Sequence, residues 1–184
     1  MTASHYALDS HAARKREKGR AHLDGFISYP TAPYTVPIGV IMPREIDNLL
    51  LPVPVSGSHI GFSTLRMEPC WMALGQAAGI TASLSIDSGY NVQKVDISQI
   101  QDRLIKQKAT LIYYRDIQPD NTNFPMVEYM GLRGYLPEWY ARLTEKIDDI
   151  TLQKWADLSG LPLHADKNMT RAEVLNIIYS NIKH

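Results

Sequence analysis

The chain has 184 residues, 45% of them hydrophobic and 21% charged, a composition typical of a soluble globular protein with one sizeable core. Nineteen basic and nineteen acidic residues give a formal net charge of zero, which argues against nucleic-acid binding. The single cysteine excludes an internal disulfide and a cysteine-based zinc cluster, and we predict no metal site. No apolar run approaches the roughly 20 residues of a membrane span. The cellular compartment stays open, because a leader peptide on a longer protein would export it.

The first 24 residues are polar and contain a group of basic side chains. These are Arg14, Lys15, Arg16, Lys18 and Arg20. We expect a solvated loop in this region, with phosphate binding as the alternative.

Short apolar runs broken by prolines follow. They predict strands at Phe26–Tyr29, Tyr34–Met42 and Asn48–Val55. The prolines restrict these strands to edges, bends or short ladders, because proline has no N–H to donate. The third run is apolar at nearly every position and predicts a strand buried on both faces.

A long helix is predicted over Pro69–Ser88. Proline suits its first position, and Gly89 is expected to end it in a left-handed conformation. Gly75, Gly79 and Ser83 fall at i, i+4 and i+8 and so share one face. Each glycine costs about 1 kcal/mol relative to alanine inside a helix. We therefore expect a sheet or a ligand to press closely against this face.

A second helix is predicted to begin at Asp96, with Gln99 at the spacing of a capping box. Beyond Asn121 the pattern changes to short helices with aromatic residues. We predict helices at Phe124–Arg133, at Leu152–Ser159, and after a capping box that begins at Thr170. The predicted fold class is α+β, with a first domain of residues 1–120 and a small helical subdomain of residues 121–184.

The common nucleotide-binding sequences are missing from this chain. It contains no Gly-x-Gly-x-x-Gly turn, no Walker A loop and no His-Glu-x-x-His helix. The first of these turns cradles the pyrophosphate in dinucleotide-binding folds. By itself, the chain is not expected to hold a dinucleotide.

The most specific motifs lie in residues 48–79. An Asn-Leu-Leu sequence begins at Asn48, a Ser-Gly-Ser-His turn ends at His59, an Arg-Met-Glu-Pro helix start covers Arg66–Pro69, and Gly-Gln-Ala-Ala-Gly covers Gly75–Gly79. In this order they resemble the C-terminal block of the FAD-dependent oxidoreductase family whose members often carry the name xanthan lyase. The segments at residues 9–11 and 33–37 also resemble features of that family, so the resemblance covers roughly residues 6–115.

The resemblance implies a C-terminal part of a FAD-dependent oxidoreductase, inactive without a nucleotide-binding half that lies outside this sequence. It implies that the start of the long helix faces the flavin ring, because a helix start offers unpaired N–H groups and partial positive charge. The cofactor-binding residues are then Met67, Glu68, Pro69, Cys70, Trp71 and Met72. The backbone N–H groups of the last three are the expected donors to the FAD.

His59 and Arg66 are the predicted catalytic residues. His59 suits proton transfer beside the flavin, and the alternative is a loop histidine that holds a backbone carbonyl. Arg66 suits an anionic substrate or the flavin, and the alternative is a pair with Glu68 or another carboxylate. Asp9 and His11 lie two apart, a spacing that suits neither a helical face nor a close metal pair, and we do not expect catalysis there.

Cys70 falls in a helix first turn, where a thiol pKa is usually lowered, although an inert packed cysteine is the better interpretation. A cluster of aromatic residues suits either a sugar-stacking platform or, preferably, the core of the helical subdomain. It consists of Tyr135, Trp139, Tyr140 and Trp155.

Two other functions stay open. A polysaccharide (xanthan) lyase or carbohydrate-binding protein is the first, with Tyr34, His59 and Arg66 as its base and its charge neutraliser. A surface-attachment or interaction module in residues 121–184 is the second. The substrate is a small molecule or a carbohydrate of unknown identity. The isolated chain is expected to expose apolar surface and to self-associate.

Overall fold

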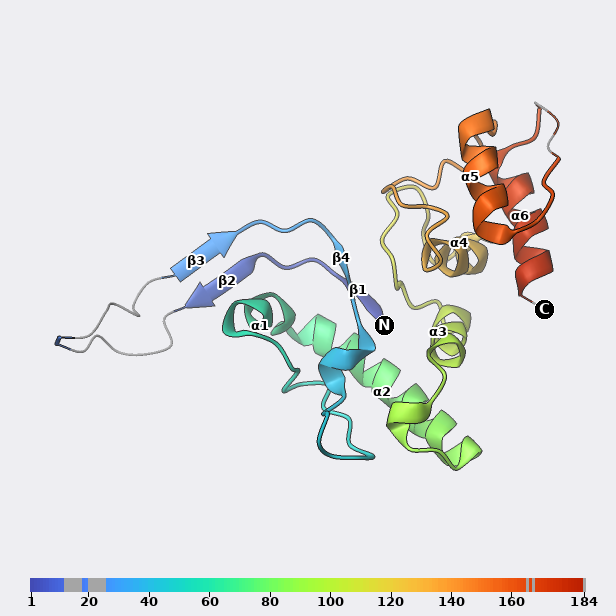
Figure 1. Cartoon of the computed structure of the whole chain (residues 1–184). Coiled ribbons are helices and arrows are strands. Elements are labelled where there is room, and N and C mark those ends of the chain that lie inside the picture. Colours follow the sequence, from blue (N-terminus) through green and yellow to red (C-terminus); the bar gives the residue numbers. More distant parts are fainter. Residues whose placement is uncertain (12–17, 20–25, 165, 167, 184) are drawn as a thin grey trace. The chain divides into compact units, whose positions relative to one another are not determined.

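The computed structural model describes residues 1–11, 18–19, 26–164, 166 and 168–183 (Figure 1). The basic side chains Arg14, Lys15, Arg16 and Arg20 lie outside these residues. Within them, six α-helices and two small sheets make a mixed α+β fold, which confirms the predicted class. Backbone contacts divide the chain into two compact units, Met1–Leu104 and Ile105–His184. The domain boundary predicted after residue 120 stays a prediction.

The strands of the first unit form one long, interrupted hairpin. Strand β1 (Thr2–Ser4) pairs antiparallel with β4 (Tyr34–Val36), and β2 (Leu8–His11) pairs antiparallel with β3 (Phe26–Tyr29). The chain runs outward through β1 and β2 and returns through β3 and β4 (Figure 1). Two prolines lie between β3 and β4, where the ladder is interrupted, because proline cannot donate to it.

The second predicted strand is shorter than expected. It ends at Val36 instead of Met42, and Pro37 precedes a 3-10 helix, η1 (Ile38–Ile41). Proline has a fixed φ and no N–H, so it suits the entry to a helical turn better than a continuing ladder.

The third predicted strand, Asn48–Val55, is wrong: this segment is a loop. The N–H of Leu51 donates to the carbonyl oxygen of Ile41 at 2.8 Å, which ties the loop to η1. The two prolines of the segment have no N–H to offer a ladder. Val53, expected to be buried, is exposed. The apolar residues here cover η1 without forming a strand.

Two helices follow, α1 (His59–Leu65) and α2 (Glu68–Ser88). The Ser58 side chain accepts the N–H of Gly61 at 3.0 Å and so caps α1. Helix α2 begins one residue before the prediction and ends, as predicted, at Gly89 in the left-handed conformation with φ 70°. Its buried residues, which include Leu74 and Ala77, face β1 and η1.

The small-residue face of α2 does not meet the close neighbour that the sequence predicted. A Cβ atom added at Gly75 or Gly79 lies more than 4 Å from the described part of the chain. Met72 and Ile86 continue this face and are 76% and 81% exposed. Around Gly75 and Gly79 the face is therefore open to a partner that the described residues do not provide, whereas Ser83 accepts a hydrogen bond from Arg103 at 3.3 Å.

A 3-10 turn, η2 (Val92–Lys94), leads into α3 (Ile97–Lys106). The capping box predicted at this start is replaced by a tighter turn. The Asp96 carboxylate accepts the backbone N–H of Ser98 at 2.9 Å and its hydroxyl at 2.8 Å, instead of the N–H of Gln99.

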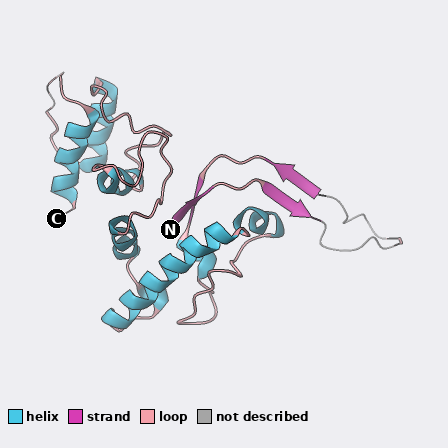
Figure 2. Ribbon diagram, turned by 180° about the vertical axis from the view of Figure 1, so that it is seen from behind, coloured by secondary structure: helices cyan, strands magenta, loops and turns pink. Residues whose placement is uncertain are grey.

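The second unit contains α4 (Phe124–Gly131), α5 (Asp149–Ser159) and α6 (Arg171–Ile182) (Figure 2). Helix α5 ends at Gly160 with φ 66°, as predicted. The predicted capping box of Thr170 with Glu173 is present at the start of α6. Helix α4 packs on α6, and the large buried side chains of this unit include Trp155, Phe124, Leu111, Met130, Leu175 and Ile178. Among the helices described, none is long and apolar enough to cross a bilayer.

Candidate functional site

The start of α2 borders a hollow in the first unit. Its volume is about 270 Å³, and it is lined by residues 3–6, which comprise the end of β1 and the turn after it, and by Met67, Pro69 and Cys70. Strand β1 lies against α2, so residues far apart in sequence share this hollow. Three of the six predicted cofactor-binding residues therefore line one concave surface.

The backbone N–H groups at this helix start are mostly engaged within the helix. Those of Cys70 and Trp71 both donate to the carbonyl oxygen of Met67, at 3.0 and 3.2 Å. Pro69 has no N–H. The N–H of Glu68 is thus the first amide of α2 that intrahelical bonding leaves out. The expected flavin donors Cys70 and Trp71 are therefore already engaged, and Met72 lies where the regular i→i−4 bonding of α2 begins.

Cys70 is a packed residue. Its side chain is 7% exposed, and burial raises the pKa of its thiol above the ordinary value. The lowering that a helix start usually produces is therefore outweighed by desolvation, which agrees with the inert interpretation.

Trp71 holds an unsatisfied donor. Its indole Nε1 is buried and, within the described part of the chain, has no hydrogen-bond partner. Buried indole N–H groups normally find an acceptor. This atom is therefore the one buried side-chain donor near the start of α2 that still requires a partner.

A group of polar side chains, which we call the Asp9 cluster, comprises Tyr6, Asp9, His11 and Arg66. One carboxylate oxygen of Asp9 lies 2.5 Å from Nη2 of Arg66, and the other lies 3.1 Å from Nε2 of His11. The Tyr6 hydroxyl donates to Asp9 at 3.3 Å, and the Arg66 guanidinium carbon lies 5.7 Å from the centre of the Tyr6 ring. Tyr6 also lines the hollow at α2, so the cluster adjoins it.

The pKa of Asp9 is lowered from its ordinary value. Partial burial raises this pKa, but His11, Arg66 and the Tyr6 hydroxyl together outweigh that effect. Asp9 is therefore a carboxylate at neutral pH, held between two cationic or potentially cationic groups.

The fold of β2 and α1 assembles this cluster. Asp9 and His11 lie at i and i+2 on a strand and so point to the same face of β2. Arg66 ends α1, which packs against β2, and the N–H of Asp9 donates to Oγ of Ser63 in that helix at 3.3 Å. The two-residue spacing, which suits neither a helix nor a metal pair, suits a strand. This was the signal in the sequence that could have identified Asp9 and His11.

The two predicted catalytic residues lie at opposite ends of α1. His59 begins the helix, and its Nε2 donates to the carbonyl oxygen of His11 at 2.8 Å, the bond expected in the alternative interpretation. Arg66 pairs with the carboxylate of Asp9 and not with Glu68, so the alternative interpretation of an ion pair holds with a different partner. Tyr34, the further lyase candidate, bonds through its hydroxyl to Oγ1 of Thr64 at 2.7 Å.

The aromatic residues of the second unit do not form one platform. Tyr135 and Trp155 are buried, and the indole N–H of Trp155 donates to the carbonyl oxygen of Tyr135 at 2.9 Å. Trp139 and Tyr140 are exposed, with the Arg115 guanidinium 5.0 and 5.8 Å from their ring centres. The core interpretation is thus confirmed for the first two residues alone.

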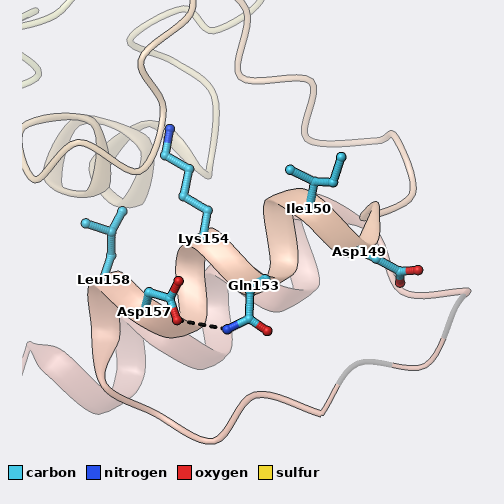
Figure 3. Close-up of a pocket in the computed structure, with 6 residues that line it drawn as sticks. All are labelled: Asp149, Ile150, Gln153, Lys154, Asp157 and Leu158. Carbon is cyan, nitrogen blue, oxygen red and sulfur yellow. Dashed lines mark hydrogen bonds between the residues drawn. The ribbon is translucent and has the colours of Figure 1, made fainter.

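A larger hollow of about 650 Å³ lies along α5, but one helix alone lines it (Figure 3). Ile150, Lys154 and Leu158 follow one side of the helix, and Gln153 donates to Asp157 at 2.8 Å on the other. A hollow without a second wall is an open helix face and cannot enclose a ligand. Among the described residues, no three His, Cys, Asp or Glu side chains are grouped for a metal ion.

Comparison with known proteins gives one family. Residues 2–104, more than half of the chain, match the sequence model of the family described as FAD dependent oxidoreductase. Searches of curated proteins and of solved structures gave no significant match. The matched residues include both the hollow at α2 and the Asp9 cluster. The match supports the flavin-dependent part of the resemblance, and nothing supports the xanthan lyase name or an attachment module.

Proposed function

Because this chain belongs to the FAD-dependent oxidoreductase family, we propose that residues 1–104 supply the flavin-ring side of a FAD site. A nucleotide-binding half outside this sequence would hold the rest of the cofactor. When bound, a flavin accepts a hydride from an organic donor, which is chemistry that the cofactor brings. The observation that carries this proposal is the family match across the hollow at the start of α2.

The size of the hollow fits a partial site. Complete ligand pockets usually have volumes of roughly 300–1,000 Å³ and bury most of the ligand. At about 270 Å³ the hollow lies just below this range, so it fits one part of the cofactor and not the whole dinucleotide. The rest of the wall would come from the missing half. Met67, Pro69 and Cys70 would contact the ring edge, and the N–H of Glu68 would be its backbone donor.

The indole of Trp71 also fits a missing partner. A buried donor without an acceptor costs about 1–3 kcal/mol. The cofactor or the nucleotide-binding half would supply that acceptor, and its binding would recover this free energy. Among the described residues this is the buried polar atom that best agrees with an incomplete site.

The open face of α2 is the proposed contact for the nucleotide-binding half. Glycines permit a close approach of another backbone, and here the space beside Gly75 and Gly79 is unfilled. Met72 and Ile86 add exposed apolar surface to the same face. In the isolated chain this surface would also favour self-association.

Arg66 is the proposed catalytic residue on the substrate side of the site, and His59, the other catalytic residue that the sequence predicts, is proposed as a positioning residue. The Arg66 guanidinium is partly exposed and already fixed by Asp9, so it would present a preorganised positive charge to an anionic donor or to the flavin. His59 fixes the end of β2 through the carbonyl oxygen of His11.

The test uses the complete gene product, with its nucleotide-binding half, and FAD as the probe. We expect the purified protein to retain FAD, detected by flavin absorbance. Gly79→Leu would place a bulky side chain on the contact face and abolish FAD retention. Gly79→Ala, the matched control, adds only a methyl group and would retain it.

The isolated chain separates assembly from folding. Because Gly79 has open space around it, Gly79→Leu should not destabilise this chain, and should add up to about 1 kcal/mol through helix propensity. A complete protein without FAD would refute the proposed function. FAD retention by Gly79→Leu at the level of the unmodified protein would refute the proposed contact face.

A further inference from the structure

The Asp9 cluster contains an aspartate–histidine pair on the exposed face of β2. Nε2 of His11 faces Oδ1 of Asp9 at 3.1 Å, and the His11 side chain is 72% exposed. A carboxylate that holds one imidazole nitrogen fixes the tautomer and the orientation of the ring. The other nitrogen, Nδ1, has no hydrogen-bond partner within the described residues, so it is the atom open to a substrate.

The surroundings keep this carboxylate in place. Oδ2 of Asp9 contacts Arg66 at 2.5 Å and the Tyr6 hydroxyl at 3.3 Å. The pKa of Asp9 lies below its ordinary value because its charged neighbours outweigh its partial burial. Strand β3 places Phe26, which does not titrate, opposite His11. Among the residues that the structure describes, the charged and titratable groups around His11 are therefore Asp9, Arg66, Tyr6 and His59.

His59 is less suited to carry a proton than His11. Its Nε2 is committed to a neutral carbonyl oxygen, that of His11, at 2.8 Å. Nε2 of His11 instead faces a carboxylate oxygen, and its Nδ1 stays open. The bond from His59 instead fixes the backbone of His11 at the end of β2.

We propose that His11 is the proton-transfer residue of this oxidoreductase, that Asp9 is its positioning residue, and that the donor substrate carries its reacting hydrogen on a carbon that bears a hydroxyl. This proposal rests on the proposed function. A bound flavin would supply the hydride acceptor for the carbon–hydrogen bond of such a donor, whose hydroxyl would become a carbonyl. The hydroxyl proton must also leave, and Nδ1 of His11 would accept it.

The first experiment probes the pair without any flavin. Diethyl pyrocarbonate acylates unprotonated imidazole nitrogens, and mass spectrometry of this chain gives the rate at each histidine. We take each rate on its alkaline plateau, where it no longer changes with pH and so reports the reactivity of the neutral ring. There we expect His11 to react faster than His164, and Asp9→Asn to slow His11 several-fold while the rate at His164 stays unchanged. Equal rates at His11 with and without the carboxylate would overturn the positioning role of Asp9.

A second measurement requires no variant, so it still applies where Asp9→Asn fails to fold. The ¹⁵N chemical shifts of neutral imidazole distinguish its two tautomers. We expect the proton of neutral His11 on Nε2, toward Asp9. A proton on Nδ1 would remove the proposed acceptor atom and overturn the proposal.

The last experiment uses the complete, FAD-loaded enzyme, with glycerol, glucose and lactate as hydroxyl donors and simple amines as the comparison. Flavin reduction by a hydroxyl donor should fall about 100-fold or more in His11→Gln and much less in His59→Gln. The inference would be overturned if His11→Gln reduced its flavin as fast as the unmodified enzyme does, or if no hydroxyl donor reduced the flavin of the unmodified enzyme. A complete protein without FAD would instead refute the proposed function, and the acylation and tautomer results would stand.

Discussion

The buried carboxyl group of Glu128 should make the stability of the second unit fall as the pH rises. Glu128 is 1% exposed, and Oε2 accepts the backbone N–H groups of Leu111 and Ile112 at 3.0 and 2.9 Å. Burial raises the pKa of Glu128 to about 7, despite these two hydrogen bonds, which lower it. In the folded chain the group therefore holds its proton up to near-neutral pH.

The magnitude follows from linkage between protonation and folding. Between pH 4.5, the ordinary value for this group, and about pH 7, the folded state holds a proton that the unfolded state has lost. The free energy of unfolding therefore falls with rising pH across this window and levels off above it. At about 1.4 kcal/mol per pKa unit, the total loss is about 3 kcal/mol.

Glu128→Gln isolates this effect. Glutamine keeps an oxygen that can accept both N–H groups but cannot ionise. We expect urea unfolding, followed by tryptophan fluorescence, to which the buried Trp155 contributes, to give a free energy of unfolding that falls in the unmodified chain between pH 4.5 and 7. The histidines contribute equally to the free energy of unfolding of both proteins, so subtracting the value for the variant from that for the unmodified chain removes their contribution. A difference that stays constant across this window would refute the reasoning.

Three further outcomes are expected. Gly131→Ala should destabilise the chain by about 1–3 kcal/mol in urea unfolding, because the added Cβ would lie 2.2 Å from the buried hydroxyl of Tyr114, whereas Gly39→Ala, with open space, should change little. Thr170→Ala removes the N-cap of α6 and should lower the free energy of unfolding by about 1 kcal/mol, measured by thermal unfolding. An unchanged midpoint would show that the cap does not stabilise the helix. Cys70 should react with a thiol reagent slowly in the folded chain and rapidly in urea, because burial raises the pKa of its thiol. Equal rates in the two states would show that the thiol is not buried.

The elements that the sequence determined are those with local signals. Helix α2 ends at Gly89 and α5 ends at Gly160, both in the left-handed conformation, and α6 begins with the capping box of Thr170. Each of these signals acts within one turn of the chain, so the residue types alone specify it. The family motifs likewise lie in one continuous stretch, and the family match confirmed their flavin-dependent part.

The tertiary structure decided the contacts between distant residues. The apolar run Asn48–Val55 predicted a buried strand because its composition fits one, but a strand needs a partner with matching hydrogen bonds, and the run lies on η1 instead. The small-residue face of α2 was identified from its spacing, yet only the structure shows that the described residues leave it open.

The Asp9 cluster is the clearest case of both contributions. Sequence alone determined that Asp9 and His11 are two residues apart and that Arg66 lies just before the predicted long helix, near the predicted flavin contact. It did not predict helix α1, which Arg66 ends. It could not determine that Asp9 and Arg66, 57 residues apart, form one ion pair. That pair exists because β2 packs against α1, and such packing depends on the whole core of the first unit, whose contacts no short stretch of sequence encodes.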